Sequence, residues 1–239
     1  MGREGKTAAQ SRPSPGLKGQ MPRSLKYEIP GTDWRRSSLE LAELGFAGLF
    51  APELEHPREC VLEVGFGRGE FLLELAAKQP DAAFLGVEVS FKRVLKMARK
   101  VGRAGLRNVR LMEARGEVVL ADLLPRRCLD ALWVNFSDPW PKDRHAGRRL
   151  IQAEFVANAA RCLVPGGTLH VATDDVAYAQ QIRDVLASQF RLENVFAPDA
   201  WRGDVPGRIQ TGYEIDWRAE GRPLHFFAAR RIAAEVEDV

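Results

Sequence analysis

Residues 135–150 combine an acid, two prolines, aromatic rings and several cations in one short stretch. They read N-F-S-D-P-W-P-K-D-R-H-A-G-R-R-L and follow an apolar run, residues 131–134, with the composition of a buried strand. Because proline restricts the residue before it, we expect Asp138 and Trp140 to be held in extended geometry. A rigid carboxylate beside a cationic loop is suited to receiving a flat, anionic substrate. A proline-rich turn with a solvated run of charges would give the same pattern, so the rest of the chain must decide.

A second stretch with chemical potential is a glycine-rich turn that reads E-V-G-F-G-R-G-E from Glu63 to Glu70. Its glycines permit a tight turn and close approach of the backbone to a ligand. A dinucleotide-binding turn would place its third glycine where this chain has Glu70. The acid at Glu63 would repel a pyrophosphate, but it suits a cationic donor such as S-adenosylmethionine. Glu88, at the end of the next predicted strand, is placed to accept hydrogen bonds from ribose hydroxyls.

The elements that position these residues alternate along the chain between short apolar strands and amphipathic helices. Strands are predicted at residues 60–64, 82–89, 109–112, 130–136, 168–172, 190–196 and 224–229. Helices are predicted at residues 70–77, 91–101, 149–163 and 175–188, with an earlier helix after an N-cap at Ser37. This alternation predicts an α/β domain whose parallel sheet is covered on both faces. Ligands bind such sheets beyond the carboxyl ends of the strands, where both motifs fall.

Bulk properties exclude several classes of protein. The 239 residues are 45% hydrophobic and 28% charged, as in a globular protein, and no apolar run approaches the ~18 residues of a membrane span. The three cysteines, Cys60, Cys128 and Cys162, lack the spacing of a zinc site or disulfide framework, which favours a reducing cytoplasm. The four histidines show no metal-ligand spacing, so we expect no metal. The net charge of +3 permits a nucleic-acid partner.

We divide the chain into a tail, residues 1–30, and a single domain, residues 31–239. The tail has six Lys or Arg residues against two acids and contains four prolines, a composition typical of disorder. It is either an electrostatic arm for phosphates or a solvated terminus without function.

Five segments occur in the order that one enzyme family has them. They are E-V-G-F-G-R-G from Glu63, G-V-E-V from Gly86, N-F-S-D-P-W-P-K with its R-H and R-R continuation from Asn135, A-T-D from Ala172, and T-G-Y-E from Thr211. The chain thereby resembles the bacterial tRNA (guanine-N7)-methyltransferase family over about residues 25–232. The resemblance implies a class I methyltransferase fold: a doubly wound, mostly parallel, seven-stranded Rossmann-like sheet with helices on both faces. It also implies S-adenosylmethionine as cofactor and tRNA as partner.

The resemblance also implies a role for each matched residue. The catalytic acid beside the target base is Asp138. The residues that hold the cofactor are Glu63, Gly65, Gly67, Glu88, Arg115 and Asp138. The residues that bind the substrate are Lys142, Asp174, Thr211, Gly212, Tyr213 and Glu214. The cations expected to meet RNA phosphates, besides Lys142, are Arg144, Arg148 and Arg149. At Arg115 the family usually has an acid or amide against the adenine, so Glu113 or Glu117 is the alternative there.

These residues predict methyl transfer from S-adenosylmethionine to N7 of a guanine in tRNA. Because N7 carries a lone pair and no proton, Asp138 is expected to align the base and stabilise developing positive charge, not to remove a proton. One alternative is an exocyclic-amino methyltransferase acting on adenine or cytosine, although its loop has a second proline before the aromatic residue and this chain does not. The other is a non-catalytic RNA-binding protein on the same fold. The sequence leaves open whether the protein is a monomer or a homodimer.

Overall fold

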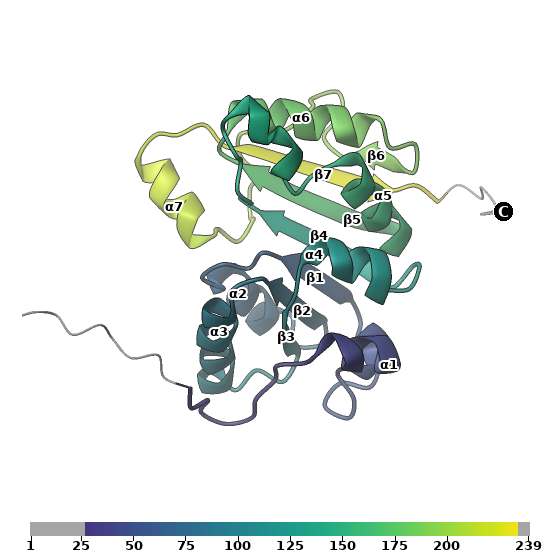
Figure 1. Cartoon of the computed structure of the whole chain (residues 1–239), viewed down its shortest axis with the longest axis vertical. Helices are drawn as coiled ribbons and strands as arrows, with labels where there is room; N and C mark the ends of the chain where they lie inside the picture. Colours follow the sequence, from purple (N-terminus) through teal and green to yellow (C-terminus); the bar gives the residue numbers. More distant parts are fainter. Residues whose placement is uncertain (1–26, 234–239) are drawn as a thin grey trace, which may run out of the picture.

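One seven-stranded sheet organises the computed structural model, which describes residues 27–233 (Figure 1). The strands are β1 (Cys60–Val64), β2 (Ala83–Glu88), β3 (Val109–Glu113), β4 (Leu129–Asn135), β5 (Leu163–Thr173), β6 (Leu192–Asn194) and β7 (His225–Arg231). Their order is β3-β2-β1-β4-β5-β7-β6, with β7 antiparallel to both of its neighbours and all other pairs parallel. The predicted doubly wound, mostly parallel sheet is confirmed. Most of the predicted basic tail lies outside the described residues.

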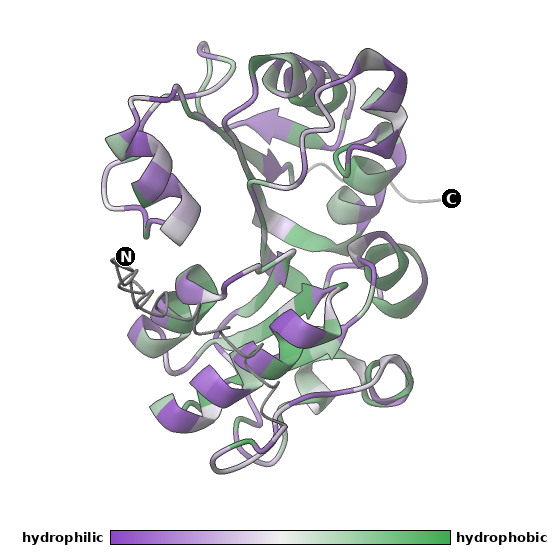
Figure 2. Ribbon diagram, turned by 60° about the vertical axis from the view of Figure 1, so that its left-hand side comes forward, coloured by the Kyte–Doolittle hydropathy of each residue, from purple (hydrophilic) through white to green (hydrophobic). Residues whose placement is uncertain are grey.

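Helices cover both faces of the sheet. They are α1 (Ser38–Gly48), α2 (Glu70–Lys78), α3 (Phe91–Ala104), α4 (Gly116–Val118), α5 (Ala153–Cys162), α6 (Val176–Ala187) and α7 (Gly212–Ala219), with the irregular turns η1 (Val119–Leu123) and η2 (Asp143–Arg148). One face is covered by α2 and α3, and the other by α1, η1, α5 and α6. Figure 2 shows the apolar residues gathered on the sheet and on the helix sides toward it. No helix within residues 27–233 is both long and apolar enough to cross a membrane.

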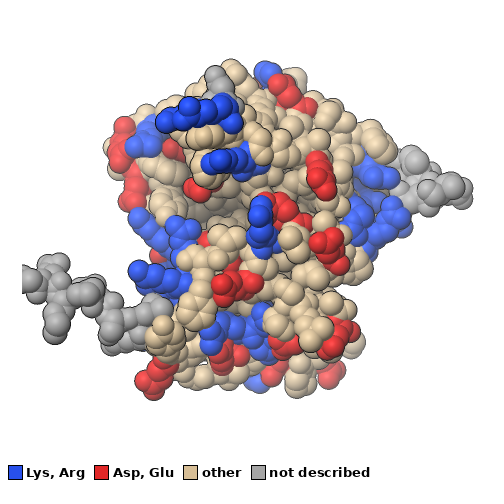
Figure 3. Space-filling model, in the orientation of Figure 1, with Lys and Arg blue, Asp and Glu red and all other residues tan. Residues whose placement is uncertain are grey.

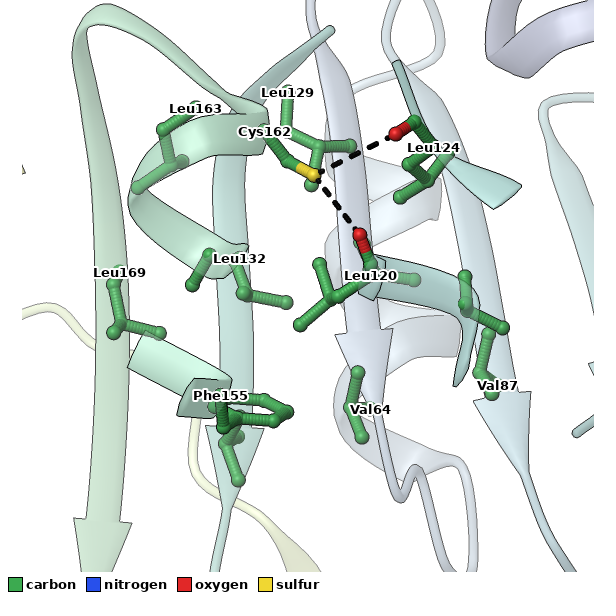
Figure 4. Packing of buried hydrophobic residues seen from close by; sticks show 14 of the residues in the cluster. Val64, Val87, Leu120, Leu124, Leu129, Leu132, Phe155, Cys162, Leu163 and Leu169 are labelled. Carbon is green, nitrogen blue, oxygen red and sulfur yellow. Dashed lines mark hydrogen bonds between the residues drawn. The ribbon is translucent and has the colours of Figure 1, made fainter. Parts of the chain in front are cut away.

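The alternation of side chains along each strand builds the two core clusters. On β1, Val61 faces α2 and α3, whereas Leu62 and Val64 face the side of α5. Figure 4 shows the second cluster, in which the thiol of Cys162 donates to the carbonyl oxygens of Leu120 and Leu124 at 3.5 and 4.0 Å. Each fully buried aliphatic side chain in the two clusters contributes about 1.5–3 kcal/mol to the free energy of unfolding. These clusters hold the strands whose carboxyl ends carry the two sequence motifs.

Local signals placed most elements correctly. The predicted cap at Ser37 is confirmed, because its hydroxyl accepts from the Glu40 amide while the Glu40 carboxylate accepts from the Ser37 amide. The predicted helix at residues 149–163 is wrong at its start: Arg149 is extended and α5 begins at Ala153. Residues 211–214 form the N-cap and first turn of α7.

Candidate active site

A cleft of about 730 Å³ lies at the carboxyl ends of β1, β2 and β4. The predicted residues that line it are Glu63, Gly65, Gly67, Glu88, Arg115, Asp138, Arg148, Asp174, Thr211, Gly212 and Tyr213. The predicted residues outside its lining are Lys142, Arg144, Arg149 and Glu214. A neighbouring cavity of about 530 Å³ lies over β4, β5 and β7, and none of the predicted residues lines it. We therefore place the chemistry in the cleft at the carboxyl ends of β1, β2 and β4, which most of the predicted residues line.

The glycine loop between β1 and α2 adopts a conformation that only glycine takes readily. Gly65 has a φ of 76° and Gly67 a φ of 54°, both in the left-handed region. A Cβ atom added at Gly65 would meet no atom within 4 Å, so the space beside this residue is open. The loop leads directly into α2, whose first amides face the same end of the sheet. The loop is thus shaped to bring backbone close to a ligand.

Glu63, the residue before the last of β1, is a buried carboxylate with one oxygen that is unsatisfied within the described part of the chain. Its side chain lines the cleft although the residue is only 2% exposed. One oxygen, Oε1, accepts from Asn135 Nδ2 at 3.0 Å, while Oε2 has no hydrogen-bond partner among residues 27–233. Burial raises the pKa of Glu63 to about 7, although Asn135 and Arg208 oppose the shift. A buried oxygen without a hydrogen-bond partner costs free energy. This geometry therefore fits a ligand that carries a cationic hydrogen-bond donor.

Glu88 ends β2 and ties the glycine loop to that strand. Its Oε2 accepts from the Gly67 amide at 3.1 Å, and its Oε1 accepts from the Ser90 amide at 3.1 Å. Arg93 lies 3.4 Å from the same carboxylate. Oε2 accepts from both the Gly67 amide and Arg93, whereas Oε1 accepts only from Ser90 among residues 27–233, so Oε1 can also accept from a hydroxyl in the cleft.

The loop after β4 places one exposed acid at the cleft. Asp138 is exposed and lines the cleft, and its carboxylate forms no ion pair within the described part of the chain. Trp140 was expected to be extended, but its φ is 42°, which is left-handed. Its ring packs edge-on to His145 at 5.7 Å, and Arg148 lies 5.1 Å from the ring centroid. This packing against the η2 turn outweighs the preference imposed by the following proline.

Arg149 makes its contacts inside the protein, whereas we had predicted that it contacts an RNA phosphate. Its side chain is buried, donating through Nε to the Pro139 carbonyl at 2.8 Å and through Nη1 to Gln181 Oε1 at 2.8 Å. It also lies 5.3 Å from the ring centroid of Tyr178. These contacts hold the proline loop against α6 and occupy Nε and Nη1 of the guanidinium. Exposed cations remain at Lys142, Arg144 and Arg148.

The first turn of α7 closes the cleft from the other side. Thr211 caps this helix by accepting from the Glu214 amide at 3.0 Å. The carboxylate of Glu214 is buried and forms ion pairs with Arg208 and Arg218. In this structure it therefore fixes the position of α7, whereas we had predicted that it contacts the substrate. Arg68 lies 4.6 Å from the ring centroid of Tyr213, which joins the glycine loop to α7.

Sequence reasoning missed two residues that connect these parts. Asn135 donates to Glu63 and accepts from Arg208, which in turn pairs with Glu214. The two carboxylates are therefore linked through one amide and one guanidinium. Asn135 could have been found as a polar residue at the buried end of an apolar strand. Arg208 lies in a stretch without periodicity, and nothing in the sequence signals its burial.

Known proteins share both the fold and the sequence pattern. The sheet order and the acid-flanked glycine loop are those of class I methyltransferases, and a solved structure of the 16S rRNA methyltransferase KamB matches with a TM-score of 0.56 at 16% identity, covering 74% of this chain and 89% of that one. A family described as putative methyltransferase matches residues 57–227. The tRNA (guanine-N(7)-)-methyltransferase of Halorhodospira halophila is 38% identical over 195 residues, which are 80% of this chain and 83% of that protein. The chain belongs to the tRNA (guanine-N7)-methyltransferase family.

A second relative matches a smaller share of its own length. The tRNA (guanine-N(7)-)-methyltransferase of Thermotoga maritima is 31% identical over 207 residues, which are 87% of this chain but only 62% of that protein. Family and fold together imply a methyl donor of the S-adenosylmethionine type. The unsatisfied Oε2 of Glu63 and the open space at Gly65 fit such a donor.

Donor affinity is expected to increase with pH up to about 7. An ammonium group of the donor paired with Glu63 would favour the ionised carboxylate, whose pKa is about 7 without donor, so binding below that pH would release a proton. We expect affinity for S-adenosylmethionine to fall by up to about tenfold per pH unit below 7. Titration calorimetry between pH 5.5 and 7.5, in buffers of different ionisation enthalpy, measures both effects.

Two variants sharpen this measurement. Glu63→Gln should bind the donor weakly and without pH dependence, whereas Glu70→Gln, which changes an exposed acid of the same cleft, should keep the wild-type profile. A flat wild-type profile would contradict the role of Glu63.

Without donor, the raised pKa has the opposite consequence: protonated Glu63 stabilises the fold below about pH 4.5, and this contribution is lost as pH rises through about 7.

Proposed function

We propose that this chain transfers a methyl group from S-adenosylmethionine to N7 of a guanine in tRNA. The observation that carries the proposal is the gathering of Glu63, Glu88 and Asp138 in one cleft beside an exposed cationic loop. Membership of the family supplies the acceptor. We treat residues 31–239 as one domain, since a single sheet runs from β1 to β7.

The donor would be held by the ends of β1 and β2. Glu63 would accept from its ammonium group and Glu88 from its ribose hydroxyls, with Gly65 and Gly67 at close approach. The adenine would lie near Arg115, whose exposed side chain pairs with Glu117 at 3.2 Å, and Glu117 also lines the cleft. When bound, the donor supplies an electrophilic methyl group on a sulfonium.

Asp138 would act on the acceptor base. Guanine N7 attacks with its own lone pair, so the reaction needs neither a general base nor a metal to create the nucleophile. The ring becomes cationic as the methyl group arrives, and an anionic carboxylate at the cleft stabilises that charge. The same carboxylate can accept from the guanine N1–H and amino group, which fixes the base for attack.

The tRNA would be held by groups around the mouth of the cleft. Lys142, Arg144 and Arg148 are exposed and would meet phosphates. The residues that would border the acceptor nucleotide are Asp174, Thr211, Gly212 and Tyr213. All three cysteines are free thiols, which fits a reducing compartment, and we propose the cytoplasm.

Mapping the methylated nucleoside tests this function. Incubating the protein with labelled S-adenosylmethionine and unmodified bulk tRNA should place the label in 7-methylguanosine after digestion. The Glu63→Gln variant, and tRNA that already carries 7-methylguanosine, should give little or no label. Label on an exocyclic amine of adenine or cytosine would establish the amino-methyltransferase alternative. Donor binding without transfer would establish a binding protein.

A further inference from the structure

The side of α3 that faces away from the sheet carries a stripe of positive charge, in which Arg99 and Lys100 are half-buried and the other cations are exposed. Its 14 residues contain no acid. The six cations of the stripe are Lys92, Arg93, Lys96, Arg99, Lys100 and Arg103, and the residues buried on the opposite side are Val94, Leu95, Met97, Ala98 and Val101. A helix of this length extends about 21 Å at 1.5 Å per residue. The α3 stripe is therefore long enough to follow several phosphates of a nucleic-acid backbone.

One end of the α3 stripe borders the cleft. Arg93 lines the cleft and lies 3.4 Å from the carboxylate of Glu88. Further along the helix, Lys100 donates to the Arg68 carbonyl and to Glu70, both at 2.8 Å. In the sheet, β2 and β4 lie on either side of β1. The α3 stripe, which follows β2, and the cationic loop, which follows β4, thus flank the glycine loop.

Part of the α3 stripe lacks counter-charges. Lys92, Lys96 and Arg103 are exposed and join no ion pair with the acids of residues 27–233. Two of the cations, Lys92 and Arg93, sit in the first turn, where the helix dipole disfavours positive charge. Like charges four residues apart, as at Lys92 and Lys96, also destabilise a helix by a few tenths of a kcal/mol. By contrast, α2 has acids in its exposed face, and Lys78 there pairs with Glu74.

We propose that the α3 stripe is a second phosphate-binding surface, which holds the backbone of the tRNA on the side of the cleft away from residues 142–148. The nucleotide whose base enters the cleft has RNA phosphates on both its 5′ and 3′ sides. Two cationic surfaces that flank the cleft would therefore bind the tRNA backbone in both directions. Figure 3 shows Lys and Arg side chains on both sides of the hollow that crosses this face of the molecule. The inference rests on the proposed tRNA substrate and adds where that substrate is held.

The test removes charge only from exposed residues outside the reacting centre. The triple variant K92Q/K96Q/R103Q is compared with R58Q/K78Q/R183Q, which removes the same number of exposed cations from other surfaces. We expect the α3 variant to bind tRNA at least about tenfold more weakly, and its salt dependence of log K to be shallower by about 2–3. The KM for tRNA should rise in parallel, while kcat at saturating tRNA and affinity for S-adenosylmethionine stay within twofold of wild type.

The outcomes separate this inference from the proposed function. If the α3 variant binds tRNA with the affinity and salt slope of the R58Q/K78Q/R183Q control, while wild type forms 7-methylguanosine, only the role of α3 is overturned. If wild type methylates no tRNA, the proposed function itself fails. Unchanged donor affinity and melting temperature show that the variant is folded, so weaker tRNA binding then supports the α3 surface.

Discussion

Asp138→Ala is expected to lower the turnover of tRNA about 100- to 1,000-fold, the range seen when one preorganised electrostatic group is removed from an active site. Asp138 is exposed at the cleft, so its removal creates no core cavity, and the melting temperature should stay near that of wild type. Affinity for tRNA should change little, because the phosphate-binding cations lie on other residues. Single-turnover kinetics with saturating tRNA and donor, together with a tRNA binding titration, measure the two quantities separately.

Asp138→Asn distinguishes charge from hydrogen bonding. An amide oxygen still accepts a hydrogen bond from the guanine edge, but it carries no charge to stabilise the cationic product ring. We therefore expect Asp138→Asn to be nearly as impaired as Asp138→Ala, and Glu70→Gln, an exposed acid of the same cleft, to keep most of its turnover. If Asp138→Ala turned over tRNA at the wild-type rate, Asp138 would have no role in the active site. A bell-shaped pH profile that Asp138→Asn abolishes would instead point to proton abstraction.

The parts of the fold that sequence could predict are those with a strong local cause. The apolar runs of β1 and β2 and the capping box at Ser37 carry their geometry within a few neighbouring residues. Glu63 and Glu88 could be placed at the carboxyl edge of the sheet because each lies at the end of an apolar run that predicts a strand. The glycine turn after Glu63 confirms where the first of these strands ends. The same logic brought Asp138 to the cleft, since β4 ends three residues before it.

The parts that sequence could not predict depend on contacts between distant segments. Arg149 looks like a surface cation beside Arg148, and its burial depends on contacts with Pro139 and with Tyr178 and Gln181 on α6. Trp140 departs from extended geometry because its ring packs on His145 and Arg148. Glu214 matched a substrate-binding motif, yet Arg208, six residues earlier, occupies its carboxylate. None of these partners lies at a spacing that a helix or strand period would reveal.

Arg208→Met is expected to destabilise the protein by about 3 kcal/mol, within the range for removing one partner of a buried ion pair. Its side chain is 7% exposed and the side chain of Glu214 only 1%, so the change leaves a carboxylate inside the protein. Arg218 remains 3.0 Å from that carboxylate, which places the effect at the lower end of the range. Equilibrium unfolding in urea at pH 7.5 measures the loss.

A double-mutant cycle separates the pair from the packing around it. Arg208 also lies 4.8 Å from the ring centroid of Phe226, and methionine retains apolar contact there. Adding Glu214→Gln to Arg208→Met removes the stranded charge and should restore about half or more of the lost stability. If Arg208→Met alone unfolds within 1 kcal/mol of wild type, the ion pair contributes little.

The same variant should change donor binding through Glu63. Arg208 helps to hold the pKa of Glu63 down against the effect of burial, so its removal should raise that pKa further above its ordinary value. The pH at which donor affinity reaches its plateau should therefore move upward in Arg208→Met. In Arg218→Gln, which loses the other guanidinium on Glu214, it should stay where it is in wild type. An unshifted plateau in Arg208→Met would mean that the charge of Arg208 does not lower the pKa of Glu63.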